Sequence, residues 1–397
     1  MYKNIVFALC GCLLSFGAIA QTTTVDSILK QVEQNNQELE ALNEYKESKR
    51  LELKSENNLP DPQLGVYYLP FGEHSTGDYS EFQISQSFEF PTVYIARNSL
   101  IDEQSTQLNL DYQLKKLEIL SIAKDHCLNL IYLNKRLATE NLRVDQAKQV
   151  FIQVQKLFEK EQVGILELNK AKVIWMQEQF KVQQIESDIK NVKLLLANLN
   201  GGTEINFTVR EYRNSMILPS KDSIWRERQI QDPEIIQWKQ QELIAQQALT
   251  LAKNKGLPNL TAGYNSQGVA GERFSGIYAG LSIPLWSNRN KVKAAEAQVT
   301  FHQSFTSAKT LQVLAEFEKQ YYDYEIMVAK FQEYEATLSG LNSDELLFQA
   351  YQLGELSFIE YYMELQFYRQ AYDSTLEMQY QLYISQNQLL KHQLLNL

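Results

Sequence analysis

Apolar residues recur at helical spacing over long parts of this chain, and few helix breakers interrupt them. Residues 92–163 contain neither glycine nor proline, and a second such stretch runs from 165 to 200. At about 1.5 Å per residue, an unbroken helix over the first stretch would reach roughly 110 Å, whereas a helix usually has about 11 to 12 residues. The pattern predicts long helical rods.

The stretch after Gly164 carries an apolar seam. Its members lie mostly three or four residues apart, which is the spacing of one helix face in a coiled coil. The sequence predicts that the following residues pack as one seam: Val173, Met176, Phe180, Ile185, Ile189, Val192, Leu196 and Leu199.

Two short windows, 59–91 and 256–286, hold most of the prolines and many of the glycines. From Tyr79 to Phe90 the sequence YSEFQISQSFEF alternates apolar and polar residues, as in a strand with one apolar face. Such hairpins either pack on a soluble core or face lipid. The windows predict strands over 62–70, 79–90, 258–267 and 275–286.

The two halves of the chain repeat one plan. LPDPQL at 59–64 and LPNL at 257–260 both stand between a predicted helix and a strand, and Gly164 in the first half matches Gly354 in the second. An internal repeat of this kind indicates a repeat architecture. We predict a signal at 1–20, a first repeat over 21–202, a connector at 203–231 and a second repeat over 232–397. Each repeat has two strands, a long helix (92–162; 288–352) and a return helix (166–199; 356–395).

The segment 1–20 has the pattern of a secretory signal peptide. It contains Lys3, an apolar core and the small-residue motif Ala18-Ile19-Ala20. Lipidation at Cys12 is a second interpretation, although a better cleavage site follows it. The signal favours strands that face lipid, and it predicts export to an envelope compartment.

The formal net charge of −10 comes without any basic run, which excludes a typical nucleic-acid binder. The mature sequence has no apolar run long enough for a membrane helix, but a membrane β-strand needs only about 9 to 11 alternating residues. Four strands cannot close a membrane barrel, because the smallest have about eight. Three copies would supply twelve strands, so the sequence predicts a homotrimer in outer-membrane lipid.

The sequence does not indicate an enzyme, a cofactor or a metal site. It lacks nucleophile and phosphate-loop motifs, and no histidine has a second ligand at helical spacing. The four histidines are His74, His126, His302 and His392.

The order of these elements resembles the TolC-like outer-membrane factor family over essentially the whole mature chain. The resemblance implies a mainly helical fold with a small β part, in which a trimeric twelve-stranded barrel stands on a periplasmic α-helical tube. It also implies two partners, a periplasmic adaptor (membrane fusion protein) and an inner-membrane pump of the RND class.

The same resemblance implies roles for the helix turns. Family members dock an adaptor at such tips, which here comprise Val163, Gly164, Ile165, Leu353, Gly354, Leu356 and Ser357. Some members close the pore with an acidic ring just inside the tips, and Glu360 matches that position. Its counterpart in the first repeat is Lys170, so Glu167 and Glu364 are further gate candidates.

The implied function is passive conduction of small molecules or ions through an outer-membrane exit duct of an efflux system. A duct for type I protein secretion and a periplasmic coiled-coil scaffold are the alternatives. Gly340 has no counterpart in the first half, and we expect either a local bend or a close helix contact there.

Overall fold

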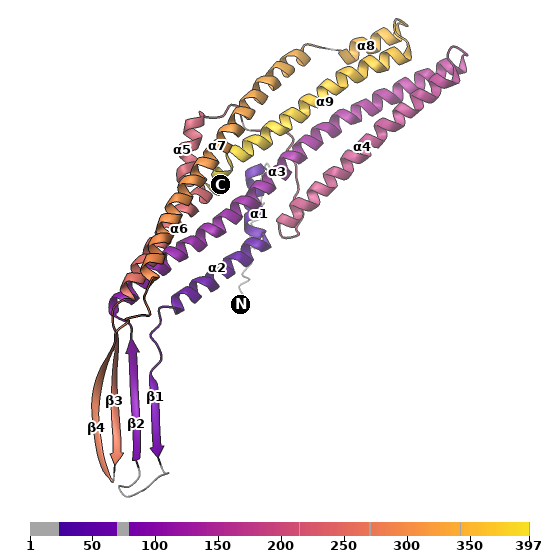
Figure 1. The fold of residues 1–397 in the computed structure, drawn as a ribbon. Coiled ribbons are helices and arrows are strands. Elements are labelled where there is room, and N and C mark those ends of the chain that lie inside the picture. Colours follow the sequence, from indigo (N-terminus) through magenta and orange to yellow (C-terminus); the bar gives the residue numbers. More distant parts are fainter. Residues whose placement is uncertain (1–23, 70–78, 214, 270, 342, 397) are drawn as a thin grey trace, which may run out of the picture.

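The computed structural model describes residues 24–396 except 70–78, 214, 270 and 342. The predicted signal, Cys12 and His74 lie outside these residues. Figure 1 shows a long helical body with a narrow sheet at one end and two helical hairpins reaching away from it at the other. The predicted fold class, mainly helical with a small antiparallel β part, is confirmed.

The sheet has four antiparallel strands in the order β1-β2-β3-β4. Leu64 lies opposite Ile84, which lies opposite Tyr264, and Tyr264 lies opposite Ile277. Because side chains alternate along a strand, this register collects the apolar residues of all four strands on one face. The strands are β1 (Gln63–Leu69), β2 (Tyr79–Phe88), β3 (Asn259–Val269) and β4 (Glu272–Ser282).

The strands lie within one or two residues of the predicted bounds except β4, whose two bounds differ most. β4 starts at Glu272 rather than 275, because Gly271 adopts a positive φ of 85° and turns the chain tightly enough for Val269 to pair with Glu272. β4 also ends at Ser282 rather than at 286. Pro284 lies just beyond that end, and it has no backbone N–H to donate to a ladder.

The helices form a layer four rods wide. Near the sheet the order across the layer is α2–α3–α6–α7, and towards the tips it is α4–α3–α9–α7, with α8 also packed on α9 (Figure 1). Thus α3 and α7 run through both halves. The helices of this layer are α2 (Gln37–Ser55), α3 (Pro91–Glu159), α4 (Ile165–Leu199), α6 (Pro233–Asn254), α7 (Lys291–Ser339), α8 (Ser343–Gln352) and α9 (Phe358–Leu389).

Short elements pack on the middle of the layer. The apolar core there brings α1 and the middle of α3 together with the end of α4, and Leu29, Leu120 and Leu196 are buried in it. The short elements are α1 (Val25–Asn35), α5 (Lys221–Gln231) and the 3-10 helix η1 (Lys391–Asn396). Among the described residues no helix combines the length and apolar character needed to cross a membrane.

The long helix predicted over 288–352 is not continuous. α7 ends at Ser339 and α8 begins at Ser343, with Gly340 as the C-cap of α7. Glycine has a low helix propensity, and the Ser339 hydroxyl donates to the Ala336 carbonyl oxygen at 3.2 Å, so the local sequence favours a helix end. A Cβ at Gly340 would meet nothing nearer than 3.9 Å, so the break within this chain is a bend and not a close contact.

The predicted seam on α4 is wrong in its first half. The face of α4 that packs on the chain carries Ala171, Glu178, Ile185 and Ile189 at helical spacing. Val173, Met176 and Phe180 lie on nearly the opposite face and are 51–59% exposed. The interval between Phe180 and Ile185 is five residues, so at about 100° per residue the apolar positions change face there.

Candidate functional site: sheet faces, helix tips and a buried ion network

One face of the sheet is apolar and uncovered in the described structure. Ile277 is 90% exposed, and Leu64, Val66 and Leu281 are each between 66% and 69% exposed. Monomeric soluble proteins rarely leave a contiguous apolar surface of this kind uncovered. This face therefore fits lipid or another apolar partner.

The opposite face of the sheet is polar and internally hydrogen-bonded. The Asn265 side-chain amide donates to Glu81 Oε1 at 2.7 Å, and Gln83 donates to the Tyr278 hydroxyl at 2.6 Å. The Tyr278 ring lies over Gly263, where a Cβ would come within 2.4 Å of it. The sheet thus presents an apolar face on one side and a polar face on the other.

The two helix tips have the same backbone geometry. At the first, the Gln162 N–H donates to the Leu157 carbonyl oxygen, and at the second, Glu355 donates to Ala350, both at 2.9 Å. This six-to-one bond with a left-handed residue before it is the Schellman motif. The left-handed residues are Glu161, with φ 59°, and Gly354, with φ 76°.

This geometry corrects the pairing of the repeats. Gly354 corresponds to Glu161, not to Gly164. Gly164 has an extended backbone and is the N-cap of α4, as Ser357 is the N-cap of α9. The same offset pairs Glu167 with Glu360 at the third position of each return helix, in place of Lys170.

The four apolar residues among the predicted docking positions divide into two groups. Val163 and Leu356 occupy equivalent positions and are half-buried against a core cluster that includes Val154 and Tyr361. Ile165 and Leu353 are 52% and 76% exposed at the two tips. The first pair therefore holds the tips in place, and the second pair is accessible to a partner.

The gate candidates do not converge within one chain. Glu360 is engaged in a capping box, in which its carboxylate accepts the Ser357 N–H at 2.9 Å. That hydrogen bond holds the pKa of the Glu360 carboxyl below its usual value. Glu364 and Lys170 are exposed, whereas Glu167 is half-buried.

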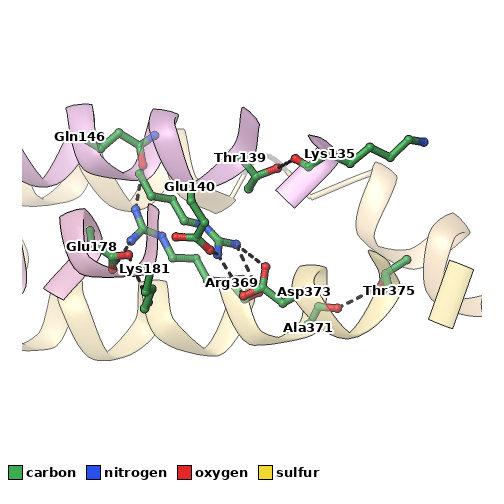
Figure 2. Close-up of polar contacts among 11 residues, drawn as sticks. Lys135, Thr139, Glu140, Gln146, Glu178, Lys181, Arg369, Ala371, Asp373 and Thr375 are labelled. Carbon is green, nitrogen blue, oxygen red and sulfur yellow. Dashed lines mark hydrogen bonds and ion pairs between the residues drawn. The ribbon is translucent and has the colours of Figure 1, made fainter. Parts of the chain in front are cut away.

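A buried ion network joins α3, α4 and α9 (Figure 2). Arg143 on α3 contacts Glu140 at 2.5 Å and Asp373 of α9 at 2.9 Å. Burial acts to lower the pKa of Arg143, but its bonds with Asp373 and Glu140 raise it overall, so the guanidinium stays charged.

The second half of the network centres on Glu178, whose side chain is fully buried. Arg369 of α9 lies 3.4 Å from it and also donates to Gln146 of α3 at 2.8 Å, while Lys181 lies 3.1 Å from it. Sequence reasoning missed this network. One sequence feature could have indicated it: Glu178 lies seven residues from both Ala171 and Ile185, and therefore on the same helix face as these two apolar residues.

No protein-family model matches the chain, and no curated protein matches its sequence. Solved structures do match its fold. The transmembrane channel CusC has a TM-score of 0.75 at 14% identity, over 92% of this chain and 91% of CusC. The outer membrane protein VceC of Vibrio cholerae has a TM-score of 0.72 at 12% identity, over 92% of this chain and 96% of VceC.

The CmeC outer membrane channel of Campylobacter jejuni also matches, with a TM-score of 0.68 at 14% identity, over 93% of this chain and 85% of CmeC. The fold implied by the resemblance to the TolC-like family is therefore confirmed along nearly the whole chain. At such identities the likeness concerns the fold.

Proposed function

We propose that this protein is the outer-membrane exit duct of a tripartite efflux system. Three copies form a twelve-stranded barrel in the outer membrane and a helical tube in the periplasm. Small molecules or ions pass through it passively, and an inner-membrane pump of the RND class supplies the energy. An adaptor docks at the tips and opens the closed end by moving the hairpins apart.

The two-faced sheet is the observation that carries this proposal. Its exposed apolar face suits the hydrocarbon region of a bilayer, and its hydrogen-bonded polar face suits a water-filled lumen. Among the described residues, β1 and β4 each pair on one side only. Open strand edges are not tolerated in lipid, so both edges need a partner.

Closure by identical copies satisfies those edges. Because the sheet has an even number of antiparallel strands, β1 and β4 run in opposite directions. A β4 edge can therefore pair antiparallel with the β1 edge of the next copy, and the arrangement repeats around a ring. Three copies give twelve strands, a number that leaves an open lumen.

The tips support the docking part of the proposal. They expose apolar side chains at Ile165 and Leu353 beside turns that share one hydrogen-bond pattern. A partner hairpin of the adaptor would contact these residues. The buried ions of Arg143, Glu178 and Arg369 would hold the helices together in the closed state.

Membrane fractionation and native mass determination test the proposal. The account predicts recovery from the outer membrane, extraction only with detergent, and a particle of about three times the 46.0 kDa chain mass, less the signal. Release as a monomer without detergent would contradict the duct and support a periplasmic scaffold.

A further inference from the structure

A coiled-coil stripe on α4 points away from the rest of the chain. Its members are Leu166, Val173, Met176 and Phe180, spaced seven, three and four residues apart like a and d positions. Leu166 is 71% exposed, and the other three are the exposed residues that were predicted to pack in the inward seam but do not. Four large apolar side chains in this register fit the surface of another helix.

The position of α4 indicates where that helix comes from. α4 forms one edge of the helical layer and α7 forms the other (Figure 1). β1 and β4 lie at the same two edges of the sheet. A neighbouring copy that places its β4 beside β1 therefore brings its α7 and α8 beside α4.

α7 carries a second exposed stripe in the same register. Its positions alternate at intervals of four and three residues, and all of them are exposed. The two positions nearer the sheet are large, and towards the tip three of the four are small. The stripe consists of Tyr322, Ile326, Ala329, Glu333, Ala336 and Gly340.

The two stripes match in size and height. The number of residues between each position and the left-handed residue of its own tip measures its height. By this measure Phe180 and Glu161 are almost as far apart as Ala336 and Gly354. Leu194, which is exposed on α4, and Tyr322 are likewise at nearly equal separations from their tips. The large side chains of α4 near the tip thus lie level with the small residues of α7, which lets the two helices approach closely.

Charge also differs between the two edges. Lys170 and Lys172 are exposed on either side of the α4 stripe. At the matching separation from its own tip, α8 exposes Glu345. Glu333 and Glu335 of α7 lie further from the tip, and Glu333 already pairs with Lys330 of α7 at 2.8 Å. Opposite charges beside an apolar seam favour pairing of unlike edges over pairing of like ones.

We propose that the α4 stripe packs against the α7 stripe of a second copy of this chain, with Phe180 and Met176 seated against Ala336 and Gly340. This interface rests on the proposed duct and deepens it, because it joins the protomers near the closed end of the tube. It also gives Gly340 a role between chains that it lacks within one chain.

Disulfide trapping tests the interface in the detergent-extracted particle. We would combine Phe180→Cys with Ala336→Cys. Burial raises the pKa of the native Cys127 thiol to about 12, so that group does not interfere. Mild oxidation should convert most of the protein to covalent dimers and trimers. The matched control pairs Phe180→Cys with Tyr334→Cys, which lies on the other side of α7, and should stay monomeric.

A particle that is trimeric by native mass but gives no crosslinked chains, or only an internal disulfide, would overturn the interface and leave the duct standing. A particle that is not trimeric would overturn both. Maleimide labelling gives a second readout. Phe180→Cys should label at least tenfold more slowly than Leu142→Cys on α3 in the purified trimer, and equal rates would show that the stripe is uncovered there.

Discussion

The two hairpins of the helical body share one turn geometry but differ in how they are stabilised. In the first hairpin α3 is continuous to Glu159, whereas in the second the outgoing rod is divided into α7 and α8 at Gly340. Residues 332–337 of α7 are exposed on every side, while Val150 and Val154 of α3 are buried. The second hairpin therefore has less packing to hold its outgoing helix.

The turns show the opposite distribution of favourable residues. The second tip has glycine at its left-handed position and a serine N-cap with a capping box. The first has Glu161, for which the left-handed region is unfavourable, and Gly164, which tolerates the N-cap position but supplies no capping oxygen. Thus favourable turn residues stabilise the second hairpin more, and packing of the long helices stabilises the first hairpin more. The two repeats therefore follow the same path but differ in stiffness.

The largest expected effect comes from separating the hairpins at the ion network. Replacing Arg369 with Met leaves Glu178 buried without its α9 partner, which costs about 3–5 kcal/mol of unfolding free energy. Denaturant unfolding of the helical body measures this. Adding Glu178→Met to the first change should recover most of the loss, and a single variant as stable as the parent would mean that the network holds nothing together.

Exchanging the left-handed residues should shift the two tips in opposite directions. Gly354→Ala forces an ordinary residue into the left-handed region at a cost of about 1–2 kcal/mol. Glu161→Gly removes that strain from the first tip, and the gain is smaller because glycine also loosens the unfolded chain. Thermal unfolding of both variants provides the comparison. Shifts of the same sign would contradict the assigned equivalence.

The N-caps give a further, smaller contrast. Ser357→Ala removes the side-chain oxygen that accepts the Glu360 N–H and should cost about 1 kcal/mol. Gly164→Ser supplies that oxygen to the first tip and should add a few tenths of a kcal/mol. Amide exchange rates in the first turns of α9 and α4 report both changes. No slowing in α4 would show that Gly164 is not a true counterpart of Ser357.

Acid should weaken the second tip slightly more than the first. The pKa of Glu360 is lowered from 4.5 by the hydrogen bond from Ser357, so its stabilising effect is complete above 4.5 and is lost as the pH falls through the lowered value. The protection factors of amides in the first turn of α9, which correct for the intrinsic slowing of exchange in acid, should therefore fall below that pH. The Glu360→Gln variant serves as the control and should lack this extra loss of protection.

Sequence periodicity was enough to predict the helical rods and the strand faces, because each depends on local spacing, but it did not predict the break at Gly340. It mispaired the tips because Glu161 is a poor candidate for a left-handed position, and only the backbone reveals that it occupies one. It placed Phe180 in the wrong seam because the apolar positions of α4 change face before Ile185. It also passed over Arg369 and Glu178, since a charged residue on a long helix ordinarily indicates a solvated surface.

Hydrogen–deuterium exchange of the intact particle tests the central contrast most directly. Peptides covering residues 343–352 of α8 should exchange faster than peptides covering 140–159 of α3, because none of the described side chains of α8 is buried and few contacts oppose its opening. Equal protection of the two outgoing rods, or faster exchange in α3, would contradict the unequal hairpins on which this account depends.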